Sequence, residues 1–346
     1  MTLYNKLEGK ILKEKVSQAP KLNRNTLSFY KYHRIEDPTA FRNALYKAWD
    51  ELGVWGRIYI ASEGINAQLS VPAENFEVFK ANINSIPFLN GVRLNIAVDD
   101  NGKSFFKLKI LIRSKIVADG LNDSSFDVTN SGQHLNAQDF NQLTTHPDTI
   151  IVDMRNHYES EVGHFKNAIC PDVDTFREEL QVVEKMLEEE KDKNIVMYCT
   201  GGIRCEKASA WMKHRGFQHV FQLNGGIIEY ARQVKEQGLE NKFIGKNFVF
   251  DERLGERISD EIISFCHQCG QPCDDHTNCK NDGCHLLFIQ CKACAEKFNA
   301  CCSDECKSII ALPEEKQKEL RQGLNKGRQV FKKGRVKDSK SGIENF

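Results

Sequence analysis

The chain has 346 residues, a formal net charge of zero and 40% hydrophobic residues, which is the composition of a globular protein with two or three domains. A zero net charge excludes a strong overall field toward nucleic acid, so any polyanion has to be bound by local basic patches. No apolar run approaches the ~20 residues that span a bilayer, and the N-terminus lacks the apolar segment of a signal peptide. We therefore expect a cytoplasmic protein that contacts no membrane.

The cysteines are distributed very unevenly. None of the 13 cysteines precedes Cys170, three lie between Cys170 and Cys205, and ten lie between Cys266 and Cys306. In the reducing cytoplasm, such cysteines are metal ligands or catalytic thiols rather than disulfides. Together with the pattern of the expected elements, this distribution predicts segments at 1–120, 124–240, 243–312 and 313–346.

The first segment is expected to be an α+β domain. Apolar alternation predicts strands at 26–32, 56–61, 65–71 and 105–115, and helical spacing predicts helices after Asp37 and around 76–83. The order βαββαβ is that of a ferredoxin-like, or acylphosphatase-like, sandwich, whose sheet carries two helices on one face. The other face of the sheet is therefore expected to be open.

Basic and aromatic side chains are expected on this open face. Strand alternation directs one set of side chains inward, namely Ile58, Ile60, Phe106, Leu108, Ile110 and Ile112. The outward set is then Arg57, Tyr59, Phe105, Lys107, Lys109, Arg113 and Lys115. Basic groups interleaved with aromatic rings can bind single-stranded RNA, which makes the outward residues candidates for substrate binding. From these residues alone, a solvated lysine face is the favoured interpretation, because charge runs are usually solvated.

The second segment is predicted to be a parallel α/β domain. Strands at 149–153, 194–198 and 219–223 alternate with helices at 176–190, 206–215 and 227–237. In such sheets, ligand sites lie beyond the carboxyl ends of the strands. Cys199 directly follows one of these ends.

Cys199 begins the stretch CTGGIRC at 199–205. A loop between a strand and a helix N-terminus directs several amides at one point, and this lowers the pKa of a thiol held there. Gly201 and Gly202 let the backbone close around the sulfur, and Arg204 adds positive charge. We expect Cys199 to be a nucleophile; the alternative, a buried structural cysteine, is disfavoured because paired glycines and an arginine pack a core poorly.

The spacing of the loop distinguishes two chemistries. Four residues separate Cys199 from Arg204, whereas cysteine phosphatases need a longer loop to surround a phosphate. The shorter loop fits one extra sulfur atom, a persulfide. With IVDMR at 151–155, GHFKNAI at 163–169 and LNGG at 223–226, this segment resembles a rhodanese domain, although Asn167 stands where glycine is usual. The resemblance implies the rhodanese fold, with Cys199 as the persulfide-bearing nucleophile.

Two further cysteines of this segment need an interpretation. Cys205 is either a resolving thiol that forms a disulfide with Cys199 or takes over its sulfur, or a small apolar residue in the first turn of the helix. We include it with Cys199 and Arg204 in the candidate catalytic group. Cys170, just before Pro171, is interpreted as structural.

The third segment has the spacing of a zinc module. C-x-x-C pairs occur at 266–269 and 291–294, and six other cysteines lie at short intervals around them. Few apolar residues are present, so a metal is expected to support the fold. One predicted ligand set is Cys266, Cys269, Cys291 and Cys294, and the second is Cys279, Cys284, Cys302 and Cys306. Spacing does not determine the pairing, and a single occupied site or a metal-free cluster remain alternatives.

The chain ends in a charged helix after Leu312 and a basic, glycine-containing tail at 323–337. The tail is expected to be disordered when free. Its composition fits a phosphate-binding arm, with a solubilising tail as the alternative.

The order of the three segments resembles the family of rhodanese-domain tRNA uridine(34) 5-hydroxylases. GRIYIASEGINA at 56–67 is similar to the N-terminal signature of that family, and YCTGGIRC at 198–205 is similar to its active-site loop. The resemblance implies oxygen-dependent 5-hydroxylation of the wobble uridine, with tRNA as partner and molecular oxygen as co-substrate. It also favours RNA contacts by the basic strands and the tail.

The residues themselves show no oxygen-activating group. We find no G-x-G-x-x-G motif for flavin or nicotinamide, and no clear set of two histidines and a carboxylate for non-haem iron. The loop alone predicts a sulfurtransferase, which remains the second hypothesis. Either enzyme would need a sulfur or electron donor protein. A third hypothesis is a non-catalytic, metal-stabilised RNA-binding adaptor, which would not need the Cys199 nucleophile.

Overall fold

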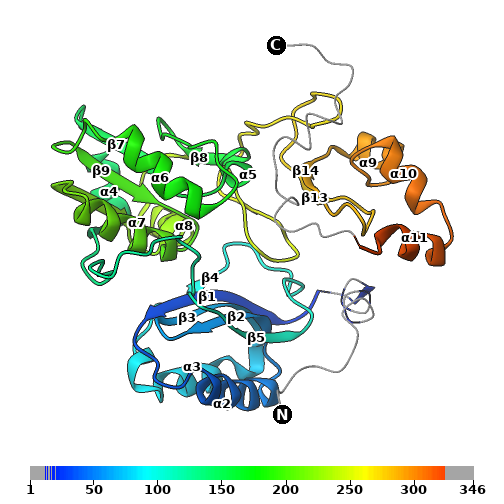
Figure 1. Ribbon diagram of the computed structural model, residues 1–346, viewed down its shortest axis with the longest axis horizontal. Coiled ribbons are helices and arrows are strands. Elements are labelled where there is room, and N and C mark those ends of the chain that lie inside the picture. Colours follow the sequence, from blue (N-terminus) through cyan, green and yellow to red (C-terminus); the bar gives the residue numbers. More distant parts are fainter. Residues whose placement is uncertain (1–11, 13, 15, 17, 20, 324–346) are drawn as a thin grey trace.

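The computed structural model describes residues 12, 14, 16, 18, 19 and 21–323. Three units follow one another along the chain: an N-terminal α+β unit, a rhodanese-like α/β unit and a cysteine-rich unit (Figure 1). The mixed α+β and α/β fold expected from the sequence is confirmed. The basic tail, apart from Gly323, lies outside the described residues.

The N-terminal unit is one five-stranded sheet with helices on one face. Its sheet has the order β4-β1-β3-β2-β5, in which only the β2–β5 pair is parallel. Trp49 and Phe79, on the two helices, are fully buried against the sheet. The elements are β1 (Arg24–Tyr32), α2 (Pro38–Glu51), β2 (Trp55–Ala61), β3 (Gly64–Pro72), the 3₁₀ turns η1 (Ala73–Asn75) and η2 (Pro87–Leu89), α3 (Phe76–Asn84), β4 (Asn95–Ile96) and β5 (Leu108–Ile112).

The edges of this sheet differ from the expectation. The strand expected at 105–115 is shorter, and it lies beside β2, while the unpredicted β4 pairs with β1 at the opposite edge. The inward assignment of Ile112 is wrong, because this last residue of an edge strand is 44% exposed. Lys115 is also not free on the open face, since its Nζ donates a 2.5 Å hydrogen bond to Asp119.

The rhodanese-like unit is built on a parallel sheet of order β6-β10-β9-β7. The three strands expected from the sequence have the predicted bounds, whereas α6 ends at Met186 and α7 already begins at Ile203. The elements are β6 (Gln133–Leu135), α4 (Ala137–Leu143), β7 (Thr149–Asp153), α5 (His157–Ser160), β8 (Gly163–Phe165), α6 (Phe176–Met186), β9 (Asn194–Tyr198), α7 (Ile203–His214), β10 (His219–Leu223) and α8 (Gly226–Gln237).

The start of the third segment packs with the rhodanese-like unit. β11 (Phe243–Asn247) pairs antiparallel with β8, and the Phe243 ring is buried in the same core as Phe165 and Tyr230. β11 and β12 (Glu256–Arg257) therefore join the start of this segment to the rhodanese-like core, and the cysteine-rich unit continues from them. Its elements are β13 (His276–Asn278), β14 (Leu287–Ile289), α9 (Lys292–Phe298), α10 (Asp304–Ile310) and α11 (Glu314–Arg321).

The open face of the N-terminal sheet faces the rhodanese-like unit, on the side opposite α2 and α3 (Figure 1). Lys207 of α7 is 1% exposed, and its Nζ donates to both Glu63 oxygens at 3.0 Å and to Asp119 at 2.5 Å. Tyr30 donates to Glu206 at 2.9 Å, and Tyr32 donates to the carbonyl of Ile203 at 3.3 Å. The loop around Cys199 is thereby held over the sheet.

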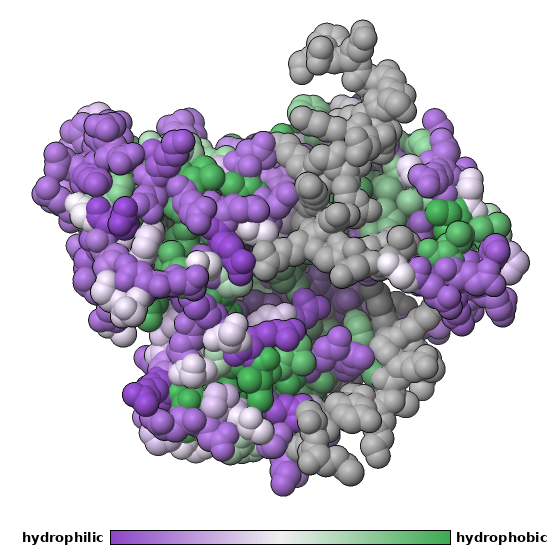
Figure 2. All heavy atoms as spheres, viewed as in Figure 1, coloured by the Kyte–Doolittle hydropathy of each residue, from purple (hydrophilic) through white to green (hydrophobic). Residues whose placement is uncertain are grey.

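Hydrophilic side chains dominate the visible surface of the rhodanese-like unit (Figure 2). Among the described helices, none combines the length and the apolar character that a bilayer-spanning segment needs.

Candidate active site and metal clusters

Cys199 lies at the carboxyl end of β9, where the sequence predicts it. The amide of Gly202 donates to its Sγ at 3.1 Å, and α7 begins at the next residue. Gly202 has a φ of 97°, a left-handed conformation that favours glycine. A Cβ at this position would also lie 2.8 Å from the Tyr30 hydroxyl oxygen. The second glycine of the loop is therefore required by both the turn and the neighbouring sheet.

The surroundings of Cys199 favour its thiolate. Burial alone would raise the pKa of this thiol, because a charge is poorly solvated inside the protein. The hydrogen bond from the Cys205 thiol, the charge of Arg204 and the amides of Cys205 and Arg204 outweigh burial. Together they lower the pKa of Cys199 to about 6, so the thiolate predominates at neutral pH.

Arg204 is oriented by a carboxylate that the sequence analysis did not single out as a site residue. Its Nη1 and Nη2 donate to the two oxygens of Glu159 at 2.5 and 2.8 Å, a two-point contact that fixes the guanidinium plane. Glu159 is fully buried and also accepts from the Asn156 amide at the start of α5. Although burial opposes the charge, Glu159 keeps the pKa of Arg204 well above its usual value.

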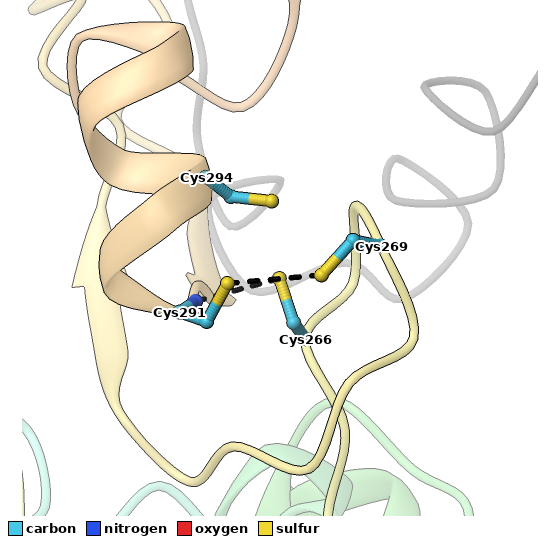
Figure 3. A group of neighbouring side chains, drawn as sticks. All are labelled: Cys266, Cys269, Cys291 and Cys294. Carbon is cyan, nitrogen blue, oxygen red and sulfur yellow. Dashed lines mark hydrogen bonds between the residues drawn. The ribbon is translucent and has the colours of Figure 1, made fainter.

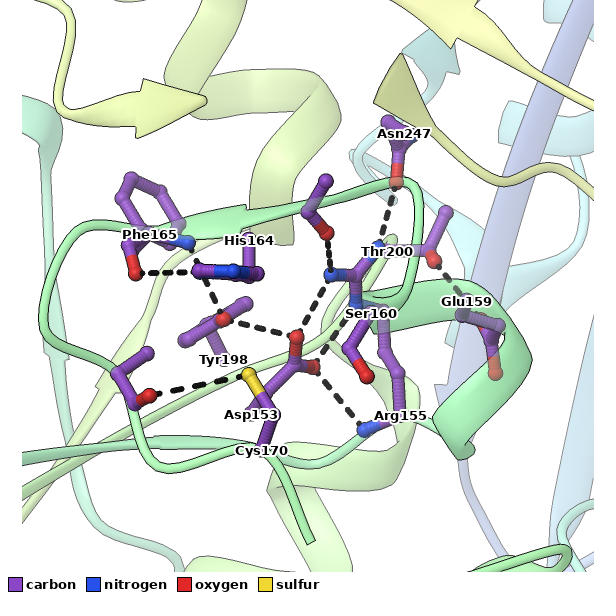
Figure 4. A network of polar contacts seen from close by, with 12 residues as sticks. Asp153, Arg155, Glu159, Ser160, His164, Phe165, Cys170, Tyr198, Thr200 and Asn247 are labelled. Carbon is purple, nitrogen blue, oxygen red and sulfur yellow. Dashed lines mark hydrogen bonds and ion pairs between the residues drawn. The ribbon is translucent and has the colours of Figure 1, made fainter. Parts of the chain in front are cut away.

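The D-x-R motif at 153–155 forms a buried hydrogen-bond network with Tyr198, the residue before Cys199. Arg155 donates to Asp153 at 2.8 and 2.6 Å and to the Gly163 carbonyl at 2.6 Å, and Tyr198 donates to Asp153 at 2.8 Å (Figure 4). All of these groups are buried. The network joins the carboxyl ends of β7 and β9 to β8, and so it holds the residue before Cys199 in place.

Cys205 lies in the first turn of α7, with its side chain in the core beside Met197 and Ala208. Burial and the neighbouring Cys199 thiolate raise its pKa well above the usual range, so Cys205 is a neutral thiol that donates to Cys199. This geometry agrees with a packing role and adds a hydrogen-bond role. Cys170 has its pKa raised to about 12, chiefly by burial, which makes it a poor nucleophile.

A cavity of about 340 Å³ separates the Cys199 loop from the N-terminal sheet. This volume is in the usual range of small-molecule pockets, roughly 300–1,000 Å³. One wall is the sheet face expected to be open, and the other contains the residues of the loop. The lining includes Ser28, Tyr30, Arg57, Tyr59, Asn66, Gln68, Asn95, Phe105, Cys199, Thr200, Gly201, Arg204, Phe250 and Glu256.

The structure divides the predicted RNA-binding residues into two groups. Arg57 and Tyr59 line the cavity with Cys199, although they are far from it in sequence. Lys109 lies opposite Arg57 on β5, and the Arg113 guanidinium is 5.5 Å from the Tyr59 ring centre. The second group does not line the cavity and lies on the adjoining edge of the sheet; it consists of Lys107 and the exposed Lys109 and Arg113.

Several lining residues were not found from the sequence, chiefly Tyr30, Asn95, Phe250 and Glu256. They come from three separate regions of the chain and carry no local motif. Strand alternation could have placed Tyr30 outward with Arg57 and Tyr59. No pattern in the sequence indicates that residues beyond 248 return to the same cavity.

The first predicted cysteine set converges in space. The sulfurs of Cys266, Cys269, Cys291 and Cys294 lie within 4.8 Å of one another and point toward a common centre (Figure 3). The Cys269–Cys291 separation is 3.7 Å. Tetrahedral coordination with metal–sulfur bonds of about 2.3 Å requires sulfurs roughly 3.8 Å apart. The cluster can therefore hold a metal ion.

The second predicted set, Cys279, Cys284, Cys302 and Cys306, meets the same criteria. The sulfurs are 3.6 Å apart in the pair Cys284–Cys302 and 3.8 Å apart in the pair Cys302–Cys306. The Asn281 amide donates to the Cys306 sulfur at 3.3 Å, as expected for a group that orients a metal-bound thiolate. Cys273 and Cys301 are buried outside both clusters.

Comparisons with known proteins agree with this architecture. Residues 24–116 match the family described as UPF0176 acylphosphatase like domain, residues 136–233 match Rhodanese-like domain, and residues 244–307 match Rhodanase C-terminal. A protein of Photorhabdus laumondii named tRNA uridine(34) hydroxylase is 57% identical over 96% of this chain and 95% of its own length. This chain belongs to the tRNA uridine(34) hydroxylase family.

Other members of the tRNA uridine(34) hydroxylase family are equally similar. The Escherichia fergusonii protein of that name is 58% identical over 96% of this chain and 95% of its own length. Among solved structures, a rhodanese-like domain from Anabaena is 21% identical, covers 32% of this chain and 78% of its own, and has a TM-score of 0.26.

The pKa of Cys199 gives a direct prediction. Alkylation of Cys199 by iodoacetamide should be half-maximal near pH 6, since the reactive thiolate is lost below its pKa of about 6. In Cys205→Ala, the midpoint should move to higher pH, because the hydrogen bond that stabilises the thiolate is lost. Peptide mapping by mass spectrometry measures each thiol separately. Cys170 is the internal control and should stay unmodified at neutral pH; a Cys199 midpoint near the ordinary value of 9 would contradict the assignment.

Proposed function

We propose that this protein is a tRNA uridine(34) 5-hydroxylase that uses Cys199 as its catalytic thiolate. The observation that carries the proposal is the 57% identity to proteins named tRNA uridine(34) hydroxylase, across 96% of the chain. The low pKa of Cys199 and its position in the wall of an interdomain cavity support a catalytic role. An adaptor would need neither feature. We also assign its activity to the cytoplasm, because the relatives are named for a tRNA substrate.

The reaction replaces the hydrogen at C5 of the uracil by a hydroxyl group. With molecular oxygen as oxidant, one oxygen atom enters the base and the other leaves as water. This balance consumes two electrons and two protons, and we assign the electrons to a donor protein. Within the chain, Arg204 positions positive charge beside the Cys199 sulfur, and Cys205 donates a hydrogen bond to it.

The basic edge of the N-terminal sheet is the proposed path of the tRNA backbone. The basic edge lies beside the cavity and contains Lys107, Lys109 and Arg113. The neighbouring strand β2 contributes Arg57 and Tyr59 to the lining of the cavity. Unpaired nucleotides bind where cations meet phosphates and aromatic rings stack on bases. This arrangement favours RNA binding over the solvated lysine face.

A sulfurtransferase is the second candidate. The loop that holds the Cys199 thiolate can also hold a persulfide, because the Gly202 amide and Arg204 would stabilise the negative charge of the persulfide as they do that of the thiolate. Sulfur transfer and hydroxylation leave different modified nucleosides in tRNA, so nucleoside analysis separates them.

We further propose that zinc fills both cysteine clusters. Four thiolates at tetrahedral spacing are the preferred ligands of structural zinc, and a fully coordinated ion leaves no position for substrate. Zinc would neutralise the thiolates and join the loops of the cysteine-rich unit to α9 and α10.

The function is tested by complementation in a bacterial strain that contains no 5-hydroxylated wobble uridine. The wild-type chain should restore 5-hydroxyuridine, measured by mass spectrometry of tRNA nucleosides. Cys199→Ser should restore none, because the ionisable sulfur is lost while the shape is nearly kept. Cys170→Ala is the matched control and should act as wild type. Restored thiolated nucleosides, without hydroxylated ones, would instead support sulfur transfer.

Zinc is tested by metal analysis of the purified chain. We expect about two ions per chain, since each predicted set has four thiolates. Cys294→Ala and Cys302→Ala should each remove one ion, whereas Cys273→Ala and Cys301→Ala should keep both. A metal-free wild-type protein with a folded cysteine-rich unit would refute the proposal.

The RNA path is tested by the salt dependence of tRNA binding. Changing Lys107, Lys109 and Arg113 to Gln should flatten the slope of log affinity against log salt by roughly 2, at about 0.7 per lost phosphate contact. The control changes Lys191, Lys193 and Lys235 of the rhodanese-like unit to Gln. If the two triple variants show the same slope, the basic edge is a solvated surface and not the path of the tRNA backbone.

A further inference from the structure

Asn95, which lines the interdomain cavity, has a buried acceptor that the proposed chemistry of Cys199 does not use. Asn95 of β4 lines the cavity and is 4% exposed, and its Nδ2 donates to the Gly201 carbonyl at 3.4 Å. Its Oδ1 is buried and has no hydrogen-bond partner among the described residues. A buried carbonyl oxygen without a donor is uncommon in folded proteins and calls for an explanation.

The orientation of the Asn95 amide follows from its neighbours. A flipped amide would place Oδ1 against the Gly201 carbonyl oxygen, so two acceptors would face each other. With Nδ2 bound to the catalytic loop, Oδ1 is the atom left for a ligand. The Gly201 contact also places this amide directly beside the loop that contains Cys199.

The rest of the cavity suits a nucleobase. Tyr30, Tyr59, Phe105 and Phe250 line the cavity and offer aromatic rings to a base. Enzymes that modify a base take it out of the stack and recognise its Watson–Crick edge in a pocket. On a uracil, that edge carries one donor, the N3–H, between two carbonyl oxygens.

We propose that the cavity is the pocket of the extruded wobble uracil, and that Asn95 Oδ1 accepts the N3–H of the base. This inference rests on the proposed hydroxylase function and adds the residue that selects the base. Cytosine has an unprotonated N3, which would face the Asn95 oxygen as a second acceptor. Asn95 therefore favours uracil over cytosine next to the Cys199 thiolate.

The protein arm of the test changes the acceptor at nearly constant volume. Asn95→Leu removes the acceptor, together with the contact of Nδ2 to the Gly201 carbonyl. In the complemented strain, Asn95→Leu should lower 5-hydroxyuridine by about 10- to 100-fold, the usual effect of losing a hydrogen bond to a buried group. The matched control is Asn90→Leu, an exposed asparagine outside the cavity.

The substrate arm changes the donor and leaves the protein intact. The wild-type chain and Asn95→Leu are each tested for binding to an anticodon stem-loop with uridine or 3-deazauridine at position 34, at one salt concentration. In 3-deazauridine, a C–H group replaces the N3–H. Wild type should bind the analogue more weakly than uridine, and Asn95→Leu should bind both equally, because each single change already removes the bond.

The outcomes separate the two proposals. If the wild-type chain restores no 5-hydroxyuridine, the hydroxylase function fails. If wild type is active but binds 3-deazauridine as well as uridine, the Asn95 inference is overturned, even when Asn95→Leu does not fold. Equal hydroxylation by Asn95→Leu and wild type would overturn it as well.

Discussion

The buried ammonium group of Lys207 determines how the catalytic loop meets the N-terminal sheet. Lys207 lies on α7, close to the Cys199 loop. Its Nζ binds Glu63, from the hairpin between β2 and β3, and Asp119, from the segment between β5 and β6. Hydrogen bonds from Lys115 and Lys207 lower the pKa of Asp119 although burial opposes its charge. Removing one partner from such a buried group typically costs about 3–5 kcal/mol, because the remaining charges stay buried.

Because of this contact, the candidate active site is formed by two units. The rhodanese-like unit supplies the Cys199 thiolate and its amides, and the N-terminal sheet supplies the opposite wall of the cavity. Tyr30 links both, since its hydroxyl donates to Glu206 and leaves room only for glycine at position 202. A loop that otherwise suits sulfur chemistry is thus covered by a surface with aromatic rings and amides, which favours a base as the reacting partner.

Local chemistry explains why much of the molecule could be predicted. The amides that stabilise Cys199 belong to its own loop, so the strand end, the glycines and Arg204 were sufficient to predict a loop that favours the thiolate. The two cysteine sets converge as expected because C-x-x-C pairs and short spacings bring thiolates together. Ile112 and β4 were misjudged because burial at a sheet edge depends on what covers that edge, which alternation does not reveal.

The sequence by itself determined the order of the units, the position of Cys199 at a strand end and the two groups of converging cysteines, because each depends on residues that are close along the chain. Only the tertiary structure decided that Arg57 and Tyr59 line one cavity with Cys199, that Glu159 orients Arg204, and that Asn95 Oδ1 has no hydrogen-bond partner among the described residues. These relations join residues that are far apart in the chain. They depend on buried ion pairs, hydrogen bonds and packing within and between units, whose partners no local periodicity or spacing can identify.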